Sequence, residues 1–299
     1  MGGCENGICK PLEGRNALMQ RSLQRYFWLF LLPTLIAFCI SFLIPFVMGV
    51  GLSFTEFTTV TDARFVGLRN YIDALTGNPD FINAFWFTVK FTAVSVISIN
   101  LLAFILALFL TKGLRGTNFF RTAFFTPNLI GGIVLGYIWQ LIINGVLAGM
   151  GVDLTYDASY GFWGLVVLMN WQMIGYMMII YVAGLQNIPS ELGEVASIDG
   201  ANGWQTLRHI TLPLVMPSVT VCTFLTLSNS FKMFDQNFAL TAGAPGKQTQ
   251  MLALDIFNTF YGSVGQEGVG QAKAVLFFLL VSLIALIQLR FTRKREADV

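Results

Sequence analysis

Charged side chains are scarce in this sequence. They make up 11% of the 299 residues, whereas 55% of the residues are hydrophobic, and the mean hydropathy is +0.66. A soluble domain carries roughly 25% charged residues, so the composition excludes an ordinary soluble protein and predicts an integral membrane protein. The net charge of +2 comes without a basic patch that contains interleaved aromatic residues, which excludes nucleic acid as a partner.

Residues that carry out chemistry are scarce as well. The sequence has one histidine, His209, which lies beside Arg208 and is best explained as a solvated side chain. Its four cysteines are too scattered for a disulfide framework or a metal site. Gly246-Lys247 is followed by Gln248, so the sequence has no Walker A motif. We therefore expect no enzyme activity, and no metal or cofactor bound by this chain.

Long apolar runs are abundant. The first, 27–52, has no charged residue and is too long for the core of a secretory signal, so it should remain as a membrane span. The later runs are 91–110, 124–143, 161–185, 214–231 and about 269–289, the last broken only by Lys273. Each is long enough at about 20 helical residues per crossing, and none alternates with period two as a barrel strand would. The sequence predicts an all-α integral membrane protein with six transmembrane helices.

Basic residues set the expected orientation. They gather in the tail 1–26, in 112–121 and in 290–295, whereas the loop 144–160 carries two aspartates and no Lys or Arg. Since cytoplasmic segments are enriched in Lys and Arg, both termini should be cytoplasmic. This orientation also places the loop 188–212 inside the cell.

The expected segments follow the chain in order. They are a cytoplasmic tail 1–26, a first transmembrane helix 27–52, an external loop 53–87, a core of five helices 88–291 and a cytoplasmic tail 292–299.

The loop 188–212 is dense in helix signals. Ser190 is a candidate cap for a first short helix that Gly200 can end. Asn202, with Gln205 three residues later, is typical of the start of a second short helix. We expect two short helices joined by an elbow at the glycine. On the first helix one face is shared by Leu192, Val195, Ala196 and Asp199.

The same loop resembles the EAA motif of the inner-membrane permease subunits of binding-protein-dependent ABC importers. That motif has a Glu, two small residues, Asp-Gly-Ala, and about ten residues later Ile-x-Leu-Pro. The matching residues are Glu194, Val195, Ala196, Asp199, Gly200, Ala201, Ile210, Leu212 and Pro213. Val195 departs from the pattern, because it replaces the usual first alanine. The resemblance implies a type I ABC importer permease fold with its core at 88–291. It also implies a coupling helix that sits in a cleft of a partner ATPase, which binds the ATP and Mg.

Further stretches are similar to carbohydrate permeases of this family. They are 65–71 (Phe-Val-Gly-Leu-Arg-Asn-Tyr), 121–127 (Arg-Thr-Ala-Phe-Phe-Thr-Pro), 231–234 (Phe-Lys-Met-Phe) and 240–245 (Leu-Thr-Ala-Gly-Ala-Pro). Ala244 replaces a glycine that is usual there. The resemblance implies a multi-pass protein of the cytoplasmic membrane that imports a sugar or oligosaccharide by alternating access. Its implied partners are a second permease in a heterodimer, a dimer of ATPase subunits, an extracytoplasmic solute-binding protein and membrane lipid.

Polar residues within the spans are candidates for the substrate path, because hydrocarbon offers them no partner. By the resemblance, the fourth and fifth spans line that path, and the candidates are Trp171, Tyr176, Ser228, Asn229 and Phe231. Other polar positions in or beside the spans are Asn100, Asn170, Gln172, Lys232 and Asp235. Hydrogen bonding between helices explains any single one of them equally well. Gly132-x-x-x-Gly136 is best explained by close helix packing.

Two other functions remain as alternatives. A glycerol-phosphate permease would favour fixed cations along the path, and only Lys232 is available, three residues from Asp235 and close enough on a helix to be neutralised. A self-contained secondary transporter would favour ionisable groups in mid-membrane, which the runs lack. A structural scaffold explains neither the loop nor the polar span residues.

Overall fold

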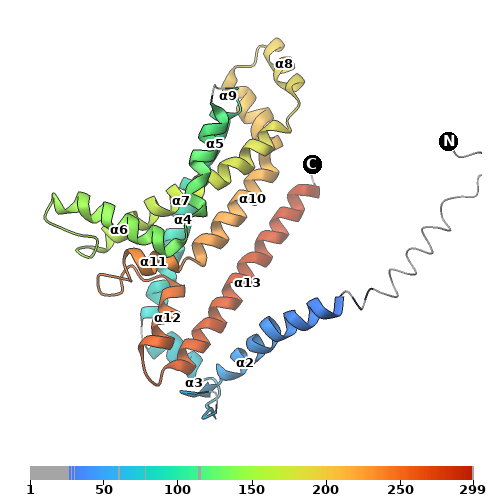
Figure 1. Ribbon diagram of the computed structural model, residues 1–299. Helices are drawn as coiled ribbons and strands as arrows, with labels where there is room; N and C mark the ends of the chain where they lie inside the picture. The colour runs from blue at the N-terminus through green and yellow to red at the C-terminus, as the bar shows by residue number, and fades with distance from the viewer. Residues whose placement is uncertain are drawn as a thin grey trace, which may run out of the picture. The chain divides into compact units, whose positions relative to one another are not determined.

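The structure is a computed structural model that describes residues 27, 29, 31–59, 61–77, 79–113 and 116–297 (Figure 1). The chain divides between Leu52 and Ser53 into two compact units. The tail predicted at 1–26 lies outside the described residues, as does Arg115 of the basic segment 112–121.

The described part of the first unit forms one long apolar helix. Residues Leu31–Leu52 form a candidate membrane span of 22 residues with a mean hydropathy of 2.5. A π-helical turn, η1 (Cys39–Leu43), precedes α2 (Ile44–Leu52). Pro45 lacks the N–H that would close the regular turn there, and a π-turn is one way for a helix to accommodate such a gap.

The second unit begins with small elements and continues into long helices. Strands β1 (Thr55–Glu56) and β2 (Arg64–Phe65) pair antiparallel, and α3 (Arg69–Ile72) and the π-turn η2 (Asp73–Gly77) follow. The buried amide of Asn70 donates to the carbonyl oxygens of Ser53 at 3.0 Å and Thr55 at 2.8 Å, which fixes the hairpin against α3.

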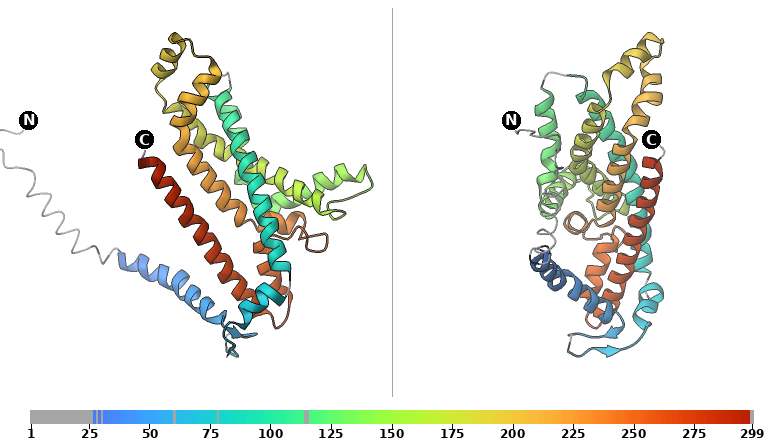
Figure 2. Two further views of the ribbon diagram at one scale, coloured as in Figure 1. Left: turned by 180° about the vertical axis from the view of Figure 1, so that it is seen from behind. Right: turned by 90° about the vertical axis from the view of Figure 1, so that its right-hand side faces the viewer.

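Four long helices build the body of this unit: α4 (Asp80–Leu110), α7 (Ala158–Gln186), α10 (Leu212–Phe231) and α13 (Glu267–Ala297). In the most apolar window of α7, 67% of the residues are buried, against 28% for α4 and 17% for the spans that contain α10 and α13. α7 is therefore the central helix, and α4 and α10 pack on it (Figure 2). The side chain of Asp157 caps its first turn by accepting from the Ser159 amide at 2.8 Å.

The third predicted span is broken. The run 124–143 was expected to form one crossing, but α5 (Thr117–Phe125) and the 3-10 turn η3 (Thr126–Leu129) meet α6 (Gly132–Ala148) at an angle of 103°. Pro127 cannot donate to the preceding turn, and Ile130 and Gly131 take extended conformations that interrupt the helix. Among the described residues, five helices are thus long and apolar enough to cross a membrane, or six if this bent pair is one span.

Glycines allow α6 to lie against a short helix after the fifth span, α11 (Asp235–Leu240). A Cβ atom added to Gly136 would lie 2.5 Å from the Cβ of Ala239, and one added to Gly132 would lie 2.7 Å from the Cβ of Asp235. Close packing therefore accounts for the spacing of these two glycines, as the sequence predicted.

The segment between α10 and α13 is folded. It contains α11 and α12 (Leu252–Gly262), and α12 packs on α13 and α4. In Figure 1, α12 and α3 lie at one end of the second unit, and the helix α8 (Ser190–Ile198) of the predicted coupling loop lies at the opposite end.

Candidate functional site

The predicted coupling loop forms a helix that ends at a glycine. α8 is followed by Gly200 in the left-handed conformation, with φ of +79°. The Ala201 amide donates to the Ala196 carbonyl at 2.9 Å, and the Gly200 amide donates to the Ser197 carbonyl at 3.2 Å. These two bonds make a Schellman motif, which satisfies the last carbonyls of the helix. The predicted helix end is confirmed.

The start of α8 differs from the prediction. Ser190 was expected to cap this helix, but Ser190 is its first residue, and the capping position is Pro189, which makes no side-chain cap bond. Proline is favoured at helix starts for a different reason, since its missing N–H would have no partner there. The proline before Ser190 shifts the boundary by one residue.

The second arm of the elbow is part of a long helix. Asn202 and Gln205 form the predicted capping box, with bonds of 2.9 Å and 2.7 Å. The helix α9 (Gly203–Thr206) then continues through a π-turn, η4 (Leu207–Thr211), into α10, so that 203–231 is one helix of 29 residues. The expected second short helix is therefore the cytoplasmic-side extension of the fifth span. Ile210 is half-buried on it, and Leu212 and Pro213 are exposed.

Large apolar side chains lie on the surface of this loop. Ile198 is 84% exposed and Trp204 68%, and Leu192 and Val195 are also exposed. The acidic motif residues Glu194 and Asp199 are exposed beside them, whereas Ala196 is buried. Apolar side chains gathered at an exposed helical elbow are typical of a contact surface for another protein.

A second site is a cavity between α7, α10 and α11. It has a volume of about 360 Å³, and Tyr176 and Asn229 of the predicted substrate path both line it. The other lining residues are Asn128, Met169, Gln172, Met173, Lys232, Met233, Phe234, Asp235 and Gln236. Its polar lining consists of four amides, one phenol, one ammonium and one carboxylate.

Two glutamines connect the walls of this cavity. Gln236 of α11 donates from Nε2 to Oε1 of Gln172 on α7 at 2.8 Å. Gln172 in turn donates from Nε2 to the Ile130 carbonyl at 3.4 Å, at the break between η3 and α6. The broken third span frees this carbonyl, and the glutamine pair joins it to both neighbouring elements.

The remaining path candidates lie elsewhere. Trp171 is 43% exposed, and its ring meets Trp139 edge-on at 5.7 Å between centroids. Phe231 is 5% exposed and packs in a small core with Phe81 and Leu252. Ser228 is half-buried and does not line the cavity. The structure thus brings Tyr176 and Asn229 together and leaves these three residues apart.

Lys232 and Asp235 were expected to neutralise each other on one helix, and this expectation is wrong. α10 ends at Phe231 and α11 begins at Asp235, so Lys232 follows the end of one helix and Asp235 begins the next. The ion pairs among the described residues are Arg69–Asp73, Lys247–Asp80 and Lys273–Asp255.

Two polar span residues hold helices together. Tyr181 of α7 donates to Oδ1 of Asn100 on α4 at 2.8 Å, and the Asn100 amide reaches Thr226 on α10 at 3.4 Å. Asn170 of α7 donates to Ser98 of α4 at 3.0 Å. For Asn100 and Asn170, hydrogen bonding between helices is the role that the structure shows.

Gln236 and Asn128 are cavity residues that the sequence did not single out. Both lie outside the charge-free cores of the fourth and fifth spans, Asn128 at the break in the third span and Gln236 beyond the end of the fifth. The available signal was weak: Asn128 follows Pro127, and Gln236 lies five residues after Phe231, each beside a stretch that resembles the family.

Comparison with known proteins agrees with this geometry. The family described as "Binding-protein-dependent transport system inner membrane component" matches residues 99–296. The chain is 44% identical over 283 residues to the "Probable starch degradation products transport system permease protein AmyD" of Thermoanaerobacterium thermosulfurigenes, covering 92% of this chain and 96% of that protein. It is 30% identical over 289 residues to the "Multiple sugar-binding transport system permease protein MsmF" of Streptococcus mutans, covering 93% and 99% of the two chains.

A solved structure shares the fold. A chain of a bacterial ABC transporter involved in the import of the acidic polysaccharide alginate superposes with a TM-score of 0.75 at 19% identity, covering 92% of this chain and 98% of that chain.

Proposed function

The chain belongs to the family of binding-protein-dependent transport system inner membrane components, and we propose that its substrate is a neutral sugar or oligosaccharide. It is a multi-pass inner-membrane permease subunit of an ABC importer, and it is not an enzyme. A self-contained secondary transporter is therefore excluded.

The sugar assignment rests on likeness over nearly the whole chain to permeases that are named for starch degradation products and for multiple sugars. The chemistry of the cavity supports it. Amide groups and the Tyr176 phenol offer both donors and acceptors to hydroxyl groups, and the lining carries one basic residue, Lys232, and one acidic residue, Asp235. A glycerol-phosphate substrate would favour an excess of fixed cations, which this lining does not offer.

Coupling to ATP hydrolysis is assigned to the loop 188–212. The exposed apolar side chains of α8 and Trp204 supply area for burial against a partner ATPase, and Glu194 and Asp199 supply charge at its edge. The Schellman end at Gly200 and the continuous helix 203–231 join this surface directly to the fifth span. A displacement of α8 is thereby transmitted to α10, which carries Asn229.

The complete importer consists of this chain, a second permease, a dimer of ATPase subunits that bind ATP and Mg, and an extracytoplasmic solute-binding protein. The core of this chain is 88–291. The cavity is exposed alternately to the two sides as the ATPase dimer closes and opens. In the described conformation, the sugar contacts Tyr176, Asn229, Gln172 and Gln236. Trp171 and Ser228 reach it only after helices shift, and Phe231 only by leaving its small core.

The test is ATP hydrolysis by the reconstituted complex with its solute-binding protein, measured with a panel of oligosaccharides and with glycerol phosphate. Stimulation by one or more sugars is expected. Stimulation by glycerol phosphate alone would reject the sugar assignment.

Path residues are tested by uptake kinetics. Gln172→Ala and Asn229→Ala should each raise the KM for sugar about tenfold, as expected for one lost hydrogen bond of about 1.4 kcal/mol. Thr220→Ala is the matched control, because Thr220 lies on the same helix as Asn229 but does not line the cavity. An equal effect of all three variants would contradict the proposed path.

A further inference from the structure

The segment 241–250, between α11 and α12, has a strained backbone. Ala242 and Lys247 both take positive φ values, 48° and 66°, in a region that side chains with a Cβ rarely enter. Such conformations persist only where the surrounding contacts hold them, and they gather at moving or binding parts of proteins. This segment includes 241–245 of the stretch 240–245 that resembles the family, and the proposed function gives it no role.

Buried hydrogen bonds hold the base of the segment. The Asn237 amide donates to the Thr249 carbonyl at 2.8 Å, and its Oδ1 accepts from the Met251 amide at 2.9 Å. Thr249 donates to the Ala244 carbonyl at 2.7 Å. Both Asn237 and Thr249 are fully buried, so the two ends of the segment are fixed next to α11.

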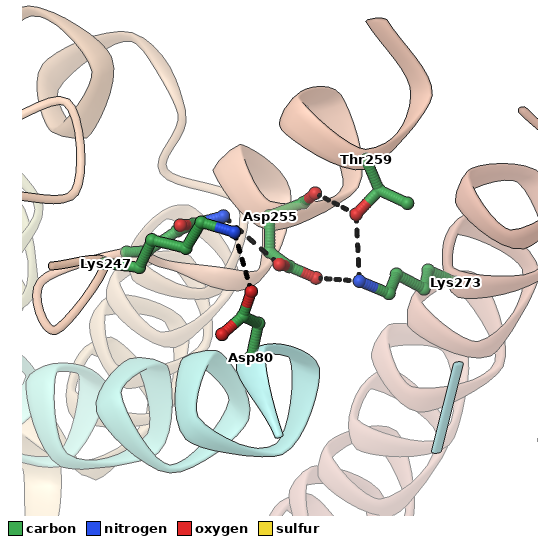
Figure 3. Close-up of polar contacts among 6 residues, drawn as sticks. Asp80, Lys247, Asp255, Thr259 and Lys273 are labelled. Carbon is green, nitrogen blue, oxygen red and sulfur yellow. Dashed lines mark hydrogen bonds and ion pairs between the residues drawn. The ribbon is translucent and has the colours of Figure 1, made fainter. Parts of the chain in front are cut away.

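A buried ion pair anchors the neighbouring helix. Lys273 of α13 donates to Oδ2 of Asp255 and to Oγ1 of Thr259, both at 2.8 Å (Figure 3). Gln250, the last residue of the segment, donates to Oδ1 of the same carboxylate at 3.1 Å. Burial raises the pKa of the Asp255 carboxyl, and the Lys273 ammonium opposes this rise. The C-terminal end of the segment is therefore held by buried hydrogen bonds.

A second ion pair, near the tip of the segment, faces water. Lys247 lies 2.7 Å from Oδ2 of Asp80, the first residue of α4, and the two side chains are 59% and 21% exposed (Figure 3). Both residues, together with Gln250 and Asp255, line a polar cavity of about 310 Å³. Solvent next to the pair lets either charge be hydrated when they separate, which the buried pair cannot achieve.

We propose that Lys247 and Asp80 form a releasable clasp between the strained segment 241–250 and the outer end of α4, and that the clasp opens when the importer turns outward. The proposal rests on the proposed alternating access. Release lets Ala242 and Lys247 leave their strained conformations, while Asn237 and the Asp255–Lys273 pair keep the base in place. Because α11 carries Gln236, the segment is connected through one short helix to the wall of the substrate cavity.

The first test is ATP hydrolysis by the assembled complex without its solute-binding protein. Lys247→Gln and Asp80→Asn should each raise this basal rate about two- to fivefold, the size expected for loss of an exposed ion pair, with little change in melting temperature. The exchange Asp80→Lys with Lys247→Asp should restore the low rate. Arg69→Gln is the matched control, since Arg69 and Asp73 form an exposed pair within one helical stretch. An unchanged basal rate, or an equal rise in Arg69→Gln, would overturn the proposal.

The second test fixes the clasp covalently. In a cysteine-free background, Asp80→Cys with Lys247→Cys is joined by a short bifunctional thiol reagent that is cleavable by reductant. Uptake should stop on cross-linking and return on cleavage. Uptake at the uncross-linked rate by the joined protein would show that the clasp need not open. The basal hydrolysis readout does not depend on the sugar, so a wrong substrate assignment would fail the panel experiment while leaving the basal hydrolysis results intact.

Discussion

Two ion pairs join the outer segments, and the water around them decides what each contributes. Lys273 and Asp255 have side chains only 5% and 3% exposed, whereas Lys247 is 59% exposed. Removing one partner of a buried pair leaves an uncompensated charge in a medium that solvates it poorly. When one residue of the exposed pair is replaced, the charge of the other is solvated by water and salt ions.

Lys273→Met should therefore lower the free energy of unfolding by about 3–5 kcal/mol, whereas Lys247→Gln should change it by less than about 1 kcal/mol. Thermal unfolding of the purified protein in detergent measures both. The double variant Asp255→Leu with Lys273→Met should recover much of the loss, because it removes both charges. Equal effects of the two lysine variants would contradict the difference in burial.

Gly175 gives a second prediction, on packing. A Cβ atom added there would lie 1.8 Å from the Phe124 carbonyl oxygen, where α5 crosses α7. Gly175→Ala should destabilise by about 3 kcal/mol, since backbone must move. Gly145→Ala is the control, because the same added atom meets nothing within 4 Å and helix propensity alone should add roughly 0.5–1 kcal/mol. Similar melting temperatures for the two variants would reject the close crossing.

At this scale the sequence predicted single residues unevenly. Tyr176 and Asn229 were accessible to prediction because a polar residue in an apolar run stands out. Gln236 and Asn237 were not, because they sit beside Asp235 in a polar stretch, and Asp255 gave no sign of its partner although it lies in the apolar stretch 251–257. Only the folded structure brings Asp255 to Lys273 or Gln236 to Gln172. Polar residues in a polar stretch give no signal of burial.

At the scale of elements, the elbow at Gly200 is the feature whose geometry leads most directly to function. Its φ is +79°, and a Cβ there would meet nothing within 4 Å, so only the backbone conformation demands glycine. Gly200→Val should leave the complex assembled but uncouple ATP hydrolysis from transport, because a branched residue resists the left-handed conformation.

Gly200→Asn is the informative companion, because asparagine tolerates this conformation far better than valine and should retain coupling. Both variants are measured by the ratio of sugar taken up to ATP hydrolysed. Normal coupling in Gly200→Val would mean that the elbow does not need its left-handed end.

Helix ends could be predicted where local chemistry sets them, as Asn202 and Gln205 show. The bend in the third span could not. The run 124–143 has the length and hydropathy of a straight crossing. The bend depends on contacts of α6 with α11 and on the hydrogen bond from Gln172 to the Ile130 carbonyl. The helix α12 was missed for a related reason, since it is short and depends on contacts with α4 and α13.

At the scale of the whole molecule, the distribution of Lys and Arg predicts which end faces the cytoplasm. A cysteine at Ser190 should react with a membrane-impermeant thiol reagent only from the cytoplasmic side, and one at Tyr156 only from outside. Tyr156 is 70% exposed and, unlike Asp157, does not cap α7, so its replacement leaves the helix start intact.

The labelling requires a background without the four native cysteines, in which buried Cys222 is replaced by alanine. Permeabilised cells, in which both positions should react, provide the control. The reverse pattern of labelling would invert the topology and remove α8 from the reach of an ATPase.

The contacts between the outer end of α4 and the segment before α12 also bear on how the chain is made. Lys247 meets Asp80 across 167 positions of sequence, and the Leu252 amide meets Thr88 across 164. Because the ribosome supplies α4 long before its partners, the nascent chain must insert its fifth span and translocate 241–252 before Asp80 and Thr88 can find them. Until then, the outer end of α4 lacks these contacts and is exposed to the cell's proteases, although most of the apolar helices have already been inserted.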